Sequence, residues 1–310
     1  MDASAVVFAY HDVGVRCLSV LLAHGVRVPL VVTHRDDPRE AIWFESVEQL
    51  ARSHGLEVAI PDDPNAIDFA ARLERMAPDF LFSFYYRHML SPRVLATARR
   101  GAFNVHGSLL PKYRGRVPVN WAVLRGERTT GATLHEMVEK PDAGRIVDQL
   151  AVPILPDDRA VDVFRKVTVA AEIVLDRSLA ALLAGKAELK PQDLAKGSYF
   201  GGRKPDDGRI DWSRGAREIH DLVRAVAPPY PGAFTLLEGR RLRILRTRLL
   251  ARRAEPARPN LRLVQGELVA ECADGGVLAI LECELDGAAL PPSVFAKHFG
   301  HAPVPLGDNP

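Results

Sequence analysis

Two polar residues stand two positions apart in the segment GAFNVHGSLLPKYRGRVP (101–118), namely Asn104 and His106. In a β-strand, residues two apart point to the same face, so the amide and the imidazole would lie side by side while Phe103 and Val105 face the other way. An amide N–H can stabilise the oxyanion of an acyl-transfer reaction by about 3 kcal/mol. A histidine beside it can move protons between nucleophile and leaving group. The pair therefore indicates acyl transfer.

A carboxylate should hold the imidazole in register, as in catalytic triads. The best candidate is Asp142, in the KPDAG loop (140–144) between two predicted strands. Each of these residues also has an ordinary structural explanation, because an Asn and a His at a strand end often cap a turn, and an Asp before Ala-Gly often belongs to one. Residue types alone leave both interpretations open.

Other catalytic motifs do not occur in the sequence. The first predicted strand is followed by YHDVG, with a single glycine where dinucleotide-binding folds have G-x-G-x-x-G, and there is no G-x-x-x-x-G-K-[ST]. The segment LHEMVEK does not match H-E-x-x-H, the ten histidines lack ligand spacing, and G-x-S-x-G is absent. Nicotinamide, flavin, P-loop and serine-hydrolase chemistry are therefore disfavoured, and we expect no metal.

The elements that position these residues follow from hydrophobic periodicity. Apolar runs alternate with helical-period segments, which predicts a βαβ series, a parallel sheet and helices on both of its faces. Ligands bind such sheets at the carboxyl ends of the strands, where a strand ending near His106 would place the polar pair. The predicted strands are 6–10, 26–34, 56–61 and 79–86, and the predicted helices are 13–24, 41–55 and 66–77.

The second half of the sequence changes character after residue 203. Before it, the pattern predicts a short helix at 117–127, strands at 131–138 and 145–155, and a long helix at 160–186. After it come two predicted hairpins, 232–250 with a turn at Glu238-Gly239 and 266–285 with a turn at Asp274-Gly275-Gly276. We therefore expect two domains: an α/β domain at 1–203, and at 204–310 a smaller β domain, either a barrel or a twisted sheet.

The composition is that of an ordinary globular protein, with 310 residues, 47% of them hydrophobic and 26% charged. The formal net charge of +2 does not favour wholesale nucleic-acid binding. Three widely spaced cysteines suit neither a disulfide framework nor a zinc site. The N-terminus lacks a basic leader, and no apolar run approaches the ~20 residues that span a bilayer. We expect a cytoplasmic protein with no membrane partner.

The segments FNVHGSLLPKYRGRVPVNWA (103–122) and DAGRIVDQ (142–149) together resemble the catalytic signature of the 10-formyltetrahydrofolate-dependent formyltransferases. That signature couples Asn-x-His, Ser-Leu-Leu-Pro, a Tyr/Trp-Arg-Gly turn and an Asp-x-Gly loop in this order. The segments FAYHDVG, THRDDPRE, SFYYRHML and RAVAPPYPGAF resemble one branch of the family. This branch is the formyltransferase half of the bifunctional enzyme that acts on UDP-4-amino-4-deoxy-L-arabinose in lipid A modification and polymyxin resistance. The likeness covers most of 6–236.

The resemblance implies a Rossmann-like catalytic domain with a mostly parallel sheet, a smaller C-terminal OB-like β domain, and 10-formyltetrahydrofolate as co-substrate. It implies that Asn104 polarises the formyl oxygen, His106 shuttles a proton and Asp142 orients the imidazole. The residues it assigns to the folate site are His88, Met89, Leu90, Arg116, Val138, Glu139, Lys140 and Pro141. Those it assigns to a nucleotide-linked amino sugar are Tyr10, His11, Asp12, Arg203, Arg224 and Tyr230.

The main alternative acceptor within the family is methionyl-tRNA. The loop RDDPRE (35–40) has a net charge of −1, which would repel a phosphate backbone. Against this, GRRLRILRTRLLARR (239–253) contains seven arginines and could bind such a backbone, or could form a solvated edge strand protected from aggregation by its charges. Hydrolysis of formyl-folate, a dehydrogenase and a non-catalytic nucleotide-binding module are further alternatives. We expect the amino sugar, with nucleic acid disfavoured.

The bifunctional enzyme carries a C-terminal decarboxylase of several hundred residues, whereas this sequence has 310 residues. We therefore expect the protein either to act alone or to meet a decarboxylase as a separate chain. The sequence predicts neither the oligomeric state nor the base of the nucleotide. His34 and His135 fit satisfied strand residues, and we assign them no part in the site.

Overall fold

The computed structural model describes residues 3–38, 40–253 and 258–307. The chain divides into two compact units. The α/β unit comprises residues 1–118, 129–153 and 164–201, and the β unit comprises residues 119–128, 154–163 and 202–310. Two short stretches that precede residue 203 therefore belong to the β unit, and the single boundary expected between 203 and 204 stays a prediction.

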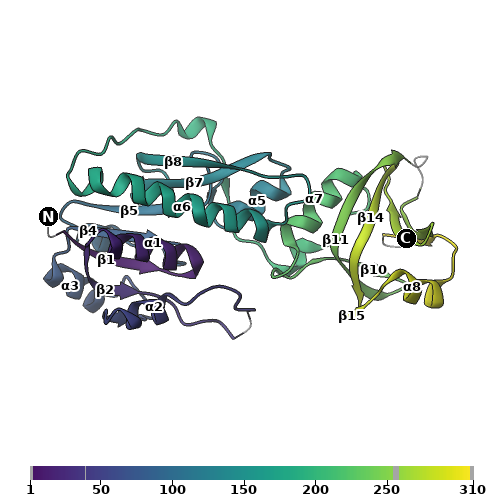
Figure 1. Cartoon of the computed structure of the whole chain (residues 1–310), viewed down its shortest axis with the longest axis horizontal. Helices are drawn as coiled ribbons and strands as arrows, with labels where there is room; N and C mark the ends of the chain where they lie inside the picture. Colours follow the sequence, from purple (N-terminus) through teal and green to yellow (C-terminus); the bar gives the residue numbers. More distant parts are fainter. Residues whose placement is uncertain (1–2, 39, 254–257, 308–310) are drawn as a thin grey trace. The chain divides into compact units, whose positions relative to one another are not determined.

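The α/β unit is built on a seven-stranded sheet with the order β3-β2-β1-β4-β5-β7-β8 (Figure 1). The neighbours from β3 to β5 are parallel, while β7 is antiparallel to both β5 and β8. This confirms the predicted Rossmann-like fold with a mostly parallel sheet. The strands are β1 (Ser4–Ala9), β2 (Arg27–Val32), β3 (Val58–Ala59), β4 (Phe80–Phe84), β5 (Gly101–His106), β7 (Thr129–Glu136) and β8 (Ile146–Pro153).

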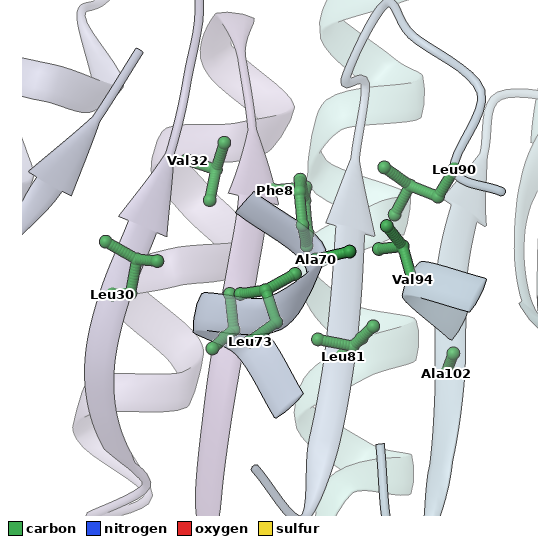
Figure 2. Packing of buried hydrophobic residues seen from close by; sticks show 10 residues of the cluster. Phe8, Leu30, Val32, Ala70, Leu73, Leu81, Leu90, Val94 and Ala102 are labelled. Carbon is green, nitrogen blue, oxygen red and sulfur yellow. The ribbon is translucent and has the colours of Figure 1, made fainter. Parts of the chain in front are cut away.

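Helices pack on the sheet through residues that alternate along the strands. On β1, Val6 and Phe8 share one face, and α3 places Ala70 and Leu73 against it (Figure 2). Both residues of α3 are fully buried, as their spacing of three along a helix favours. The helices of this unit are α1 (His11–Ala23), α2 (Val47–Ser53), α3 (Ile67–Met76), α4 (Pro92–Leu95) and α6 (Ala160–Leu183), whose first residues, 160–163, belong to the β unit. Apart from Pro118, α5 (Pro118–Leu124) also belongs to the β unit.

The helix expected at 41–55 is shorter than the prediction. It begins at Val47, where the Ser46 side chain accepts a hydrogen bond from the N–H of Gln49 and caps the first turn. Residues 41–46 form a loop in which Trp43 and Phe44 pack their rings against His11 instead of continuing the helix. Side-chain contacts outside the segment therefore override its helical period.

The β unit contains an antiparallel half-barrel with the strand order β10-β11-β14-β13-β12-β16. Both predicted hairpins are present, because β10 pairs with β11 and β13 pairs with β14. The strands are β10 (Ala233–Leu237), β11 (Arg240–Arg253), β12 (Asn260–Val264), β13 (Glu267–Glu271), β14 (Gly276–Leu285), β15 (Ala288–Ala289) and β16 (Val304–Pro305). Helices α7 (Ala216–Val226) and α8 (Pro292–Phe299) complete this unit.

The arginine-rich strand β11 is not an edge strand, contrary to one of the two sequence-based interpretations. It lies between β10 and β14, pairing with β10 through residues 240–244 and with β14 from residue 242 onward. Leu242 and Ile244 are fully buried. Irregular register between Ile244 and Thr247 then changes the alternation, so Thr247 is buried and Leu249 and Leu250 are half-buried.

A two-stranded parallel pair, β6 (Arg114–Gly115) and β9 (Tyr199–Phe200), lies outside the main sheet of the α/β unit. The 3-10 turns Leu194–Lys196 and Pro205–Gly208 follow α6 in the chain. In the part of the chain that the structure describes, no helix combines the length and apolarity that crossing a membrane requires.

Candidate active site

Two antiparallel strands bring four polar side chains to one face of the α/β sheet. β5 presents Asn104 and His106 to the same face, and β7 pairs Asn104 with His135 and His106 with Thr133. Directly opposite residues of antiparallel strands point the same way, with their Cβ atoms about 5 Å apart. The register of β5 on β7 therefore places a second histidine beside the predicted pair, and sequence reasoning had assigned that histidine no part in the site.

Asp142 joins this group from the turn between β7 and β8. Its Oδ1 lies 3.6 Å from His106 Nδ1 and 3.5 Å from His135 Nε2. Its Oδ2 accepts a hydrogen bond of 2.8 Å from the N–H of Gly115. Asn104, His106 and Asp142 are thus brought together as expected, although their chemical roles stay predictions.

The segment 113–115 holds two of the ionisable residues of this group, His106 and Asp142. The carbonyl of Tyr113 accepts a 2.8 Å hydrogen bond from His106 Nε2, and two residues on, Gly115 donates to Asp142. Ser198 secures the loop, because its hydroxyl accepts from the Tyr113 N–H. Gly115 has a φ of +97°, and a Cβ there would lie 2.2 Å from the carbonyl oxygen of Phe200, so only glycine fits.

A glutamine fifty residues downstream holds the turn that contains Asp142. The Gln192 side-chain amide donates to the carbonyl oxygens of Asp142, at 3.0 Å, and Gly144, at 2.6 Å. The turn is tight, since a Cβ on Gly144 would lie 1.9 Å from the carbonyl oxygen of Glu136. Asp142 itself has a left-handed φ of +51°. Nothing in the local sequence pattern marked Gln192 as part of the site.

The electrostatics of the group favour an ionised Asp142. Burial opposes ionisation, but His106 and the Gly115 N–H hold the pKa of Asp142 well below its usual range. The tautomer of His106 follows from its neighbours. A carbonyl oxygen can only accept, so Nε2 carries the proton toward Tyr113 and Nδ1 carries the lone pair. A proton taken up at Nδ1 therefore faces the Asp142 carboxylate.

The residues assigned to folate lie on two loops of the α/β unit and at the exposed Arg116. His88, Met89 and Leu90 follow β4, and the second loop carries Val138 to Pro141, directly before Asp142. Met89 is exposed, whereas Leu90 packs its side chain into the hydrophobic cluster shown in Figure 2. Leu90 therefore has only its backbone to offer a ligand. Contact of Arg116, Glu139, Lys140 and the other assigned residues with folate stays a prediction.

Asn65 fixes the first of these loops. Its amide nitrogen donates to the Met89 carbonyl at 2.9 Å, and its amide oxygen accepts from the Ser91 N–H at 2.7 Å. One side chain thus spans the loop that follows β4 and sets its backbone. The distance of Asn65 from this loop along the sequence explains why periodicity did not reveal it.

Tyr10, His11 and Asp12, three residues assigned to the amino sugar, contact residues that follow β2. The Tyr10 hydroxyl donates to Asp36 at 2.7 Å, and the His11 ring stacks on Phe44 with a centroid distance of 3.8 Å. Asp12 Oδ1 accepts from the N–H of Glu45 at 2.8 Å. Burial, followed by the charge of Arg87, lowers the pKa of His11 to about 3, so this ring is neutral near pH 7.

Arg203, Arg224 and Tyr230, also assigned to the amino sugar, belong to the β unit. Arg224 is buried, and its Nε lies 2.7 Å from Asp221. It also donates to the carbonyls of Val123 and Asp158, so its guanidinium is engaged within the β unit. Its predicted contact with a sugar nucleotide is untested. Arg203 lies 4.8 Å above the Trp121 ring, and burial raises the pKa of Tyr230 to about 12.

Comparison with known families identifies this arrangement. Residues 19–179 match the model of the formyl transferase family, and residues 203–300 match the model of the formyl transferase C-terminal domain. The chain belongs to the formyl transferase family, and the protein is a formyltransferase. Both matched segments agree with the two-part architecture described above.

Solved structures show which formyltransferases have a similar fold. The N-formyltransferase from Helicobacter canadensis, in complex with folinic acid and dTDP-3-aminofucose, is 19% identical, with a TM-score of 0.72 over 90% of this chain and 99% of that chain. The sugar 3N-formyltransferase WlaRD, with dTDP and 5-N-formyl-THF, is 18% identical, with a TM-score of 0.68 over 90% and 97%. HypX from Aquifex aeolicus, in complex with tetrahydrofolic acid, is 18% identical, with a TM-score of 0.63 over 95% and 47%.

Proposed function

We propose that this formyltransferase moves the formyl group of 10-formyltetrahydrofolate to the amine of a nucleotide-linked amino sugar, with UDP-4-amino-4-deoxy-L-arabinose as the acceptor. The observation that carries the proposal is the convergence of Asn104, His106 and Asp142 on one face of the sheet, with Asp142 Oδ1 3.6 Å from His106 Nδ1. An amide donor, a proton carrier and an ionised carboxylate are the groups that acyl transfer to an amine requires.

Each group has a defined task in this reaction. The uncharged amine forms a bond to the formyl carbon, and the bond from that carbon to N10 of the folate breaks. Asn104 donates an N–H to the oxygen that gains negative charge. His106 accepts the proton that the attacking nitrogen loses and returns it to N10, so that a formamide and tetrahydrofolate leave. Asp142 stabilises the imidazolium between these two proton transfers.

An amino sugar is favoured as the acceptor by the structures that this fold resembles, two of which are described as sugar N-formyltransferases or hold an amino sugar nucleotide. The charge of the chain agrees with this choice. The loop 35–40 carries two cations and three anions, and Glu40 forms a bidentate ion pair with Arg87 at 2.9 and 2.7 Å. A cation that is already paired contributes little to the neutralisation of phosphates on which tRNA binding depends.

The identity of the sugar rests on the sequence resemblance alone. The segments FAYHDVG, SFYYRHML and RAVAPPYPGAF carry that resemblance. The assignment to lipid A modification and polymyxin resistance depends on the same segments, and so does the expectation of a separate decarboxylase chain. These expectations therefore hold only if UDP-4-amino-4-deoxy-L-arabinose is the acceptor.

The decisive experiment incubates the protein with 10-formyltetrahydrofolate and, separately, with UDP-amino sugars, dTDP-amino sugars and charged initiator tRNA, and follows the release of tetrahydrofolate. We expect release with UDP-4-amino-4-deoxy-L-arabinose and a formylated sugar as the product. Formylation of tRNA and of no sugar would overturn the acceptor while leaving the chemistry intact. Formate release at the full rate without any amine would indicate a hydrolase instead.

The same assay tests the site. Asn104→Ala should lower kcat by roughly 10²- to 10³-fold, the usual cost of removing one oxyanion donor. His54→Ala, at the exposed end of α2, changes a histidine outside the site and should leave kcat unchanged. Full activity of Asn104→Ala would remove the amide from the mechanism.

A further inference from the structure

We propose that His135 is a positioning residue that fixes the amide of Asn104 in its donating orientation. The inference rests on the proposed function of the site, because it assigns a task to a residue that acts through Asn104. His135 lies opposite Asn104 in the β5–β7 pair and is only 1% exposed. Its ring contacts both Asn104 and Asp142, two of the three groups in the proposed mechanism.

The hydrogen-bonding partner of one ring nitrogen sets the role of the other. His135 Nδ1 lies 2.9 Å from the carbonyl oxygen of Glu136, which can only accept, so Nδ1 carries the proton. In the neutral ring, Nε2 then has a lone pair and requires a donor. The group that faces it, at 3.0 Å, is the side-chain amide of Asn104. The nitrogen of that amide, and not its oxygen, must therefore point toward His135.

This restriction matters because an asparagine amide has two ends with opposite hydrogen-bonding roles. The nitrogen carries two N–H groups, and His135 uses one of them. The second remains for the formyl oxygen. If the amide turned over, its own oxygen would replace the donor, and two oxygens would then face each other as charge develops on the substrate. His135 prevents this turn by accepting only a donor.

Asp142 competes with Asn104 for contact with His135 Nε2. Its Oδ1 lies 3.5 Å from His135 Nε2, farther than the 3.0 Å that separates Nε2 from the Asn104 nitrogen. The distance of 3.5 Å is at the limit for a hydrogen bond, whereas 3.0 Å is typical of one. Asp142 in turn receives the Gly115 N–H on its other oxygen. The structure therefore joins His135 to Asn104 and leaves Asp142 to serve His106.

The test compares two substitutions at the same position. Gln at position 135 can accept from Asn104 through its side-chain oxygen, whereas Leu fills similar space and accepts nothing. We expect His135→Leu to lower kcat by roughly 10- to 100-fold, since part of one oxyanion donor is lost, while KM for folate and for the amine stays within about twofold. His135→Gln should retain most of the wild-type kcat. His24→Leu, at the end of α1, is the matched control and should retain it fully.

A double-mutant cycle separates positioning from general damage. In an Asn104→Ala background, His135→Leu should cause almost no further loss of kcat, because the group that it positions is gone. An equal loss in both backgrounds, or a wild-type kcat for His135→Leu, would overturn the proposal. Absence of activity in the wild-type protein would instead count against the proposed function. The orientation of Asn104 by His135 would then be tested by nitrogen-15 NMR.

A spectroscopic measurement on the wild-type protein keeps the proposal open to refutation even if His135→Leu fails to fold. Nitrogen-15 NMR distinguishes a protonated ring nitrogen from a bare one, and the His135 signals are assigned by their loss in His135→Gln. We expect a proton on Nδ1 and none on Nε2 at the assay pH. A proton on Nε2, whether in the other tautomer or in a doubly protonated ring, would overturn the proposal.

Discussion

Two regions of this protein place charged and polar side chains on neighbouring antiparallel strands, and they do so to opposite effect. In the α/β unit, β5 and β7 bring Asn104, His106 and His135 together with Asp142. In the β unit, β11 and β14 align arginines with acidic residues. The first group is largely buried and retains donors and acceptors for a ligand. The second is largely exposed, and its charges face one another.

In the exposed group, three of the seven arginines are paired with acidic residues. Arg243 pairs with Glu284 at 3.0 Å, Arg246 pairs with Glu282 at 3.3 Å, and Arg240 pairs with Asp286 at 2.8 Å. The acids come from β14 and the turn after it, so the strand register matches cation to anion. Phosphate binding would have to break these pairs before neutralising new charge.

The two regions differ in the hydrogen-bonding groups that stay unused after the strands have paired. In the β unit, Arg240, Arg243 and Arg246 each have a carboxylate within 3.3 Å, so their charges are already compensated. Along β5 and β7 the carboxylate arrives from a turn, and the amide of Asn104 has more N–H groups than the one that His135 uses. Spare hydrogen-bonding capacity in a buried group, more than the number of charges, is therefore what distinguishes a site from a surface.

The largest effect expected from breaking the buried group is that of Asp142→Asn. The amide keeps the size of the side chain but cannot compensate a positive charge on His106, 3.6 Å away. We expect kcat to fall by roughly 10²- to 10⁴-fold, the range for loss of assisted proton transfer, with circular dichroism unchanged. Glu282→Gln, the same chemical change in the exposed group, should leave kcat as it is. Comparable losses from both substitutions would show that the buried and the exposed group do not differ in this way.

The same carboxylate should also make stability depend on pH. Burial raises the pKa of Asp142 in the folded state, but His106 and the Gly115 N–H outweigh it and lower the pKa, whereas an unfolded Asp titrates near ~3.9. A depressed pKa contributes stability above the unfolded value and loses it as the pH falls through the folded value. The wild type should therefore be more stable than Asp142→Asn at pH 7, by about 2 kcal/mol.

Urea unfolding of both proteins between pH 7 and pH 3 checks this expectation. The difference in unfolding free energy should stay constant at neutral pH and shrink below about pH 4, where the unfolded carboxylate takes up its proton. A difference that grows as the pH falls would mean that Asp142 is not held in its ionised form.

A smaller effect is expected from the residue that supports the Asp142 turn. Gln192→Leu removes two hydrogen bonds, to the carbonyls of Asp142 and Gly144. The carboxylate then loses part of its alignment with His106, and small misplacements of catalytic groups cost up to ~10²-fold. We expect a fall in kcat of about 10-fold, with KM nearly unchanged. Gln49→Leu, on the exposed side of α2, is the matched control. A wild-type kcat for Gln192→Leu would show that Gly115 alone fixes the turn.

The site residues that the sequence predicted follow from local patterns. Those that it missed depend on contacts between distant parts of the chain. Asn104 and His106 could be found because a strand period of two is local, and Asp142 because the Asp-x-Gly loop belongs to a family signature. His135 and Gln192 could not be found in this way. Their roles depend on the register of β5 against β7 and on a segment fifty residues beyond Asp142.

The fold shows the same division. The βαβ series and both hairpins follow from local periodicity and turn residues, and the structure confirms them. The place of β11 inside its sheet depends on pairing with β14, which is distant along the chain, so the edge-strand interpretation was wrong. The helix expected from residue 41 failed because Trp43 and Phe44 pack on His11 from another part of the chain.

The smallest effect is expected for the exposed ion pair between Arg246 and Glu282. Arg246 and Glu282 are both more than half exposed, and exposed ion pairs contribute about 0.2–1 kcal/mol because water and salt screen them. A double-mutant cycle of Arg246→Ala and Glu282→Ala, measured by urea unfolding, should give a coupling of about 0.5 kcal/mol or less that decreases with added salt. None of the three variants should change kcat with the amino sugar. If Glu282→Ala instead created measurable affinity for tRNA, the acidic residues of β14 would be what keeps this strand from binding nucleic acid.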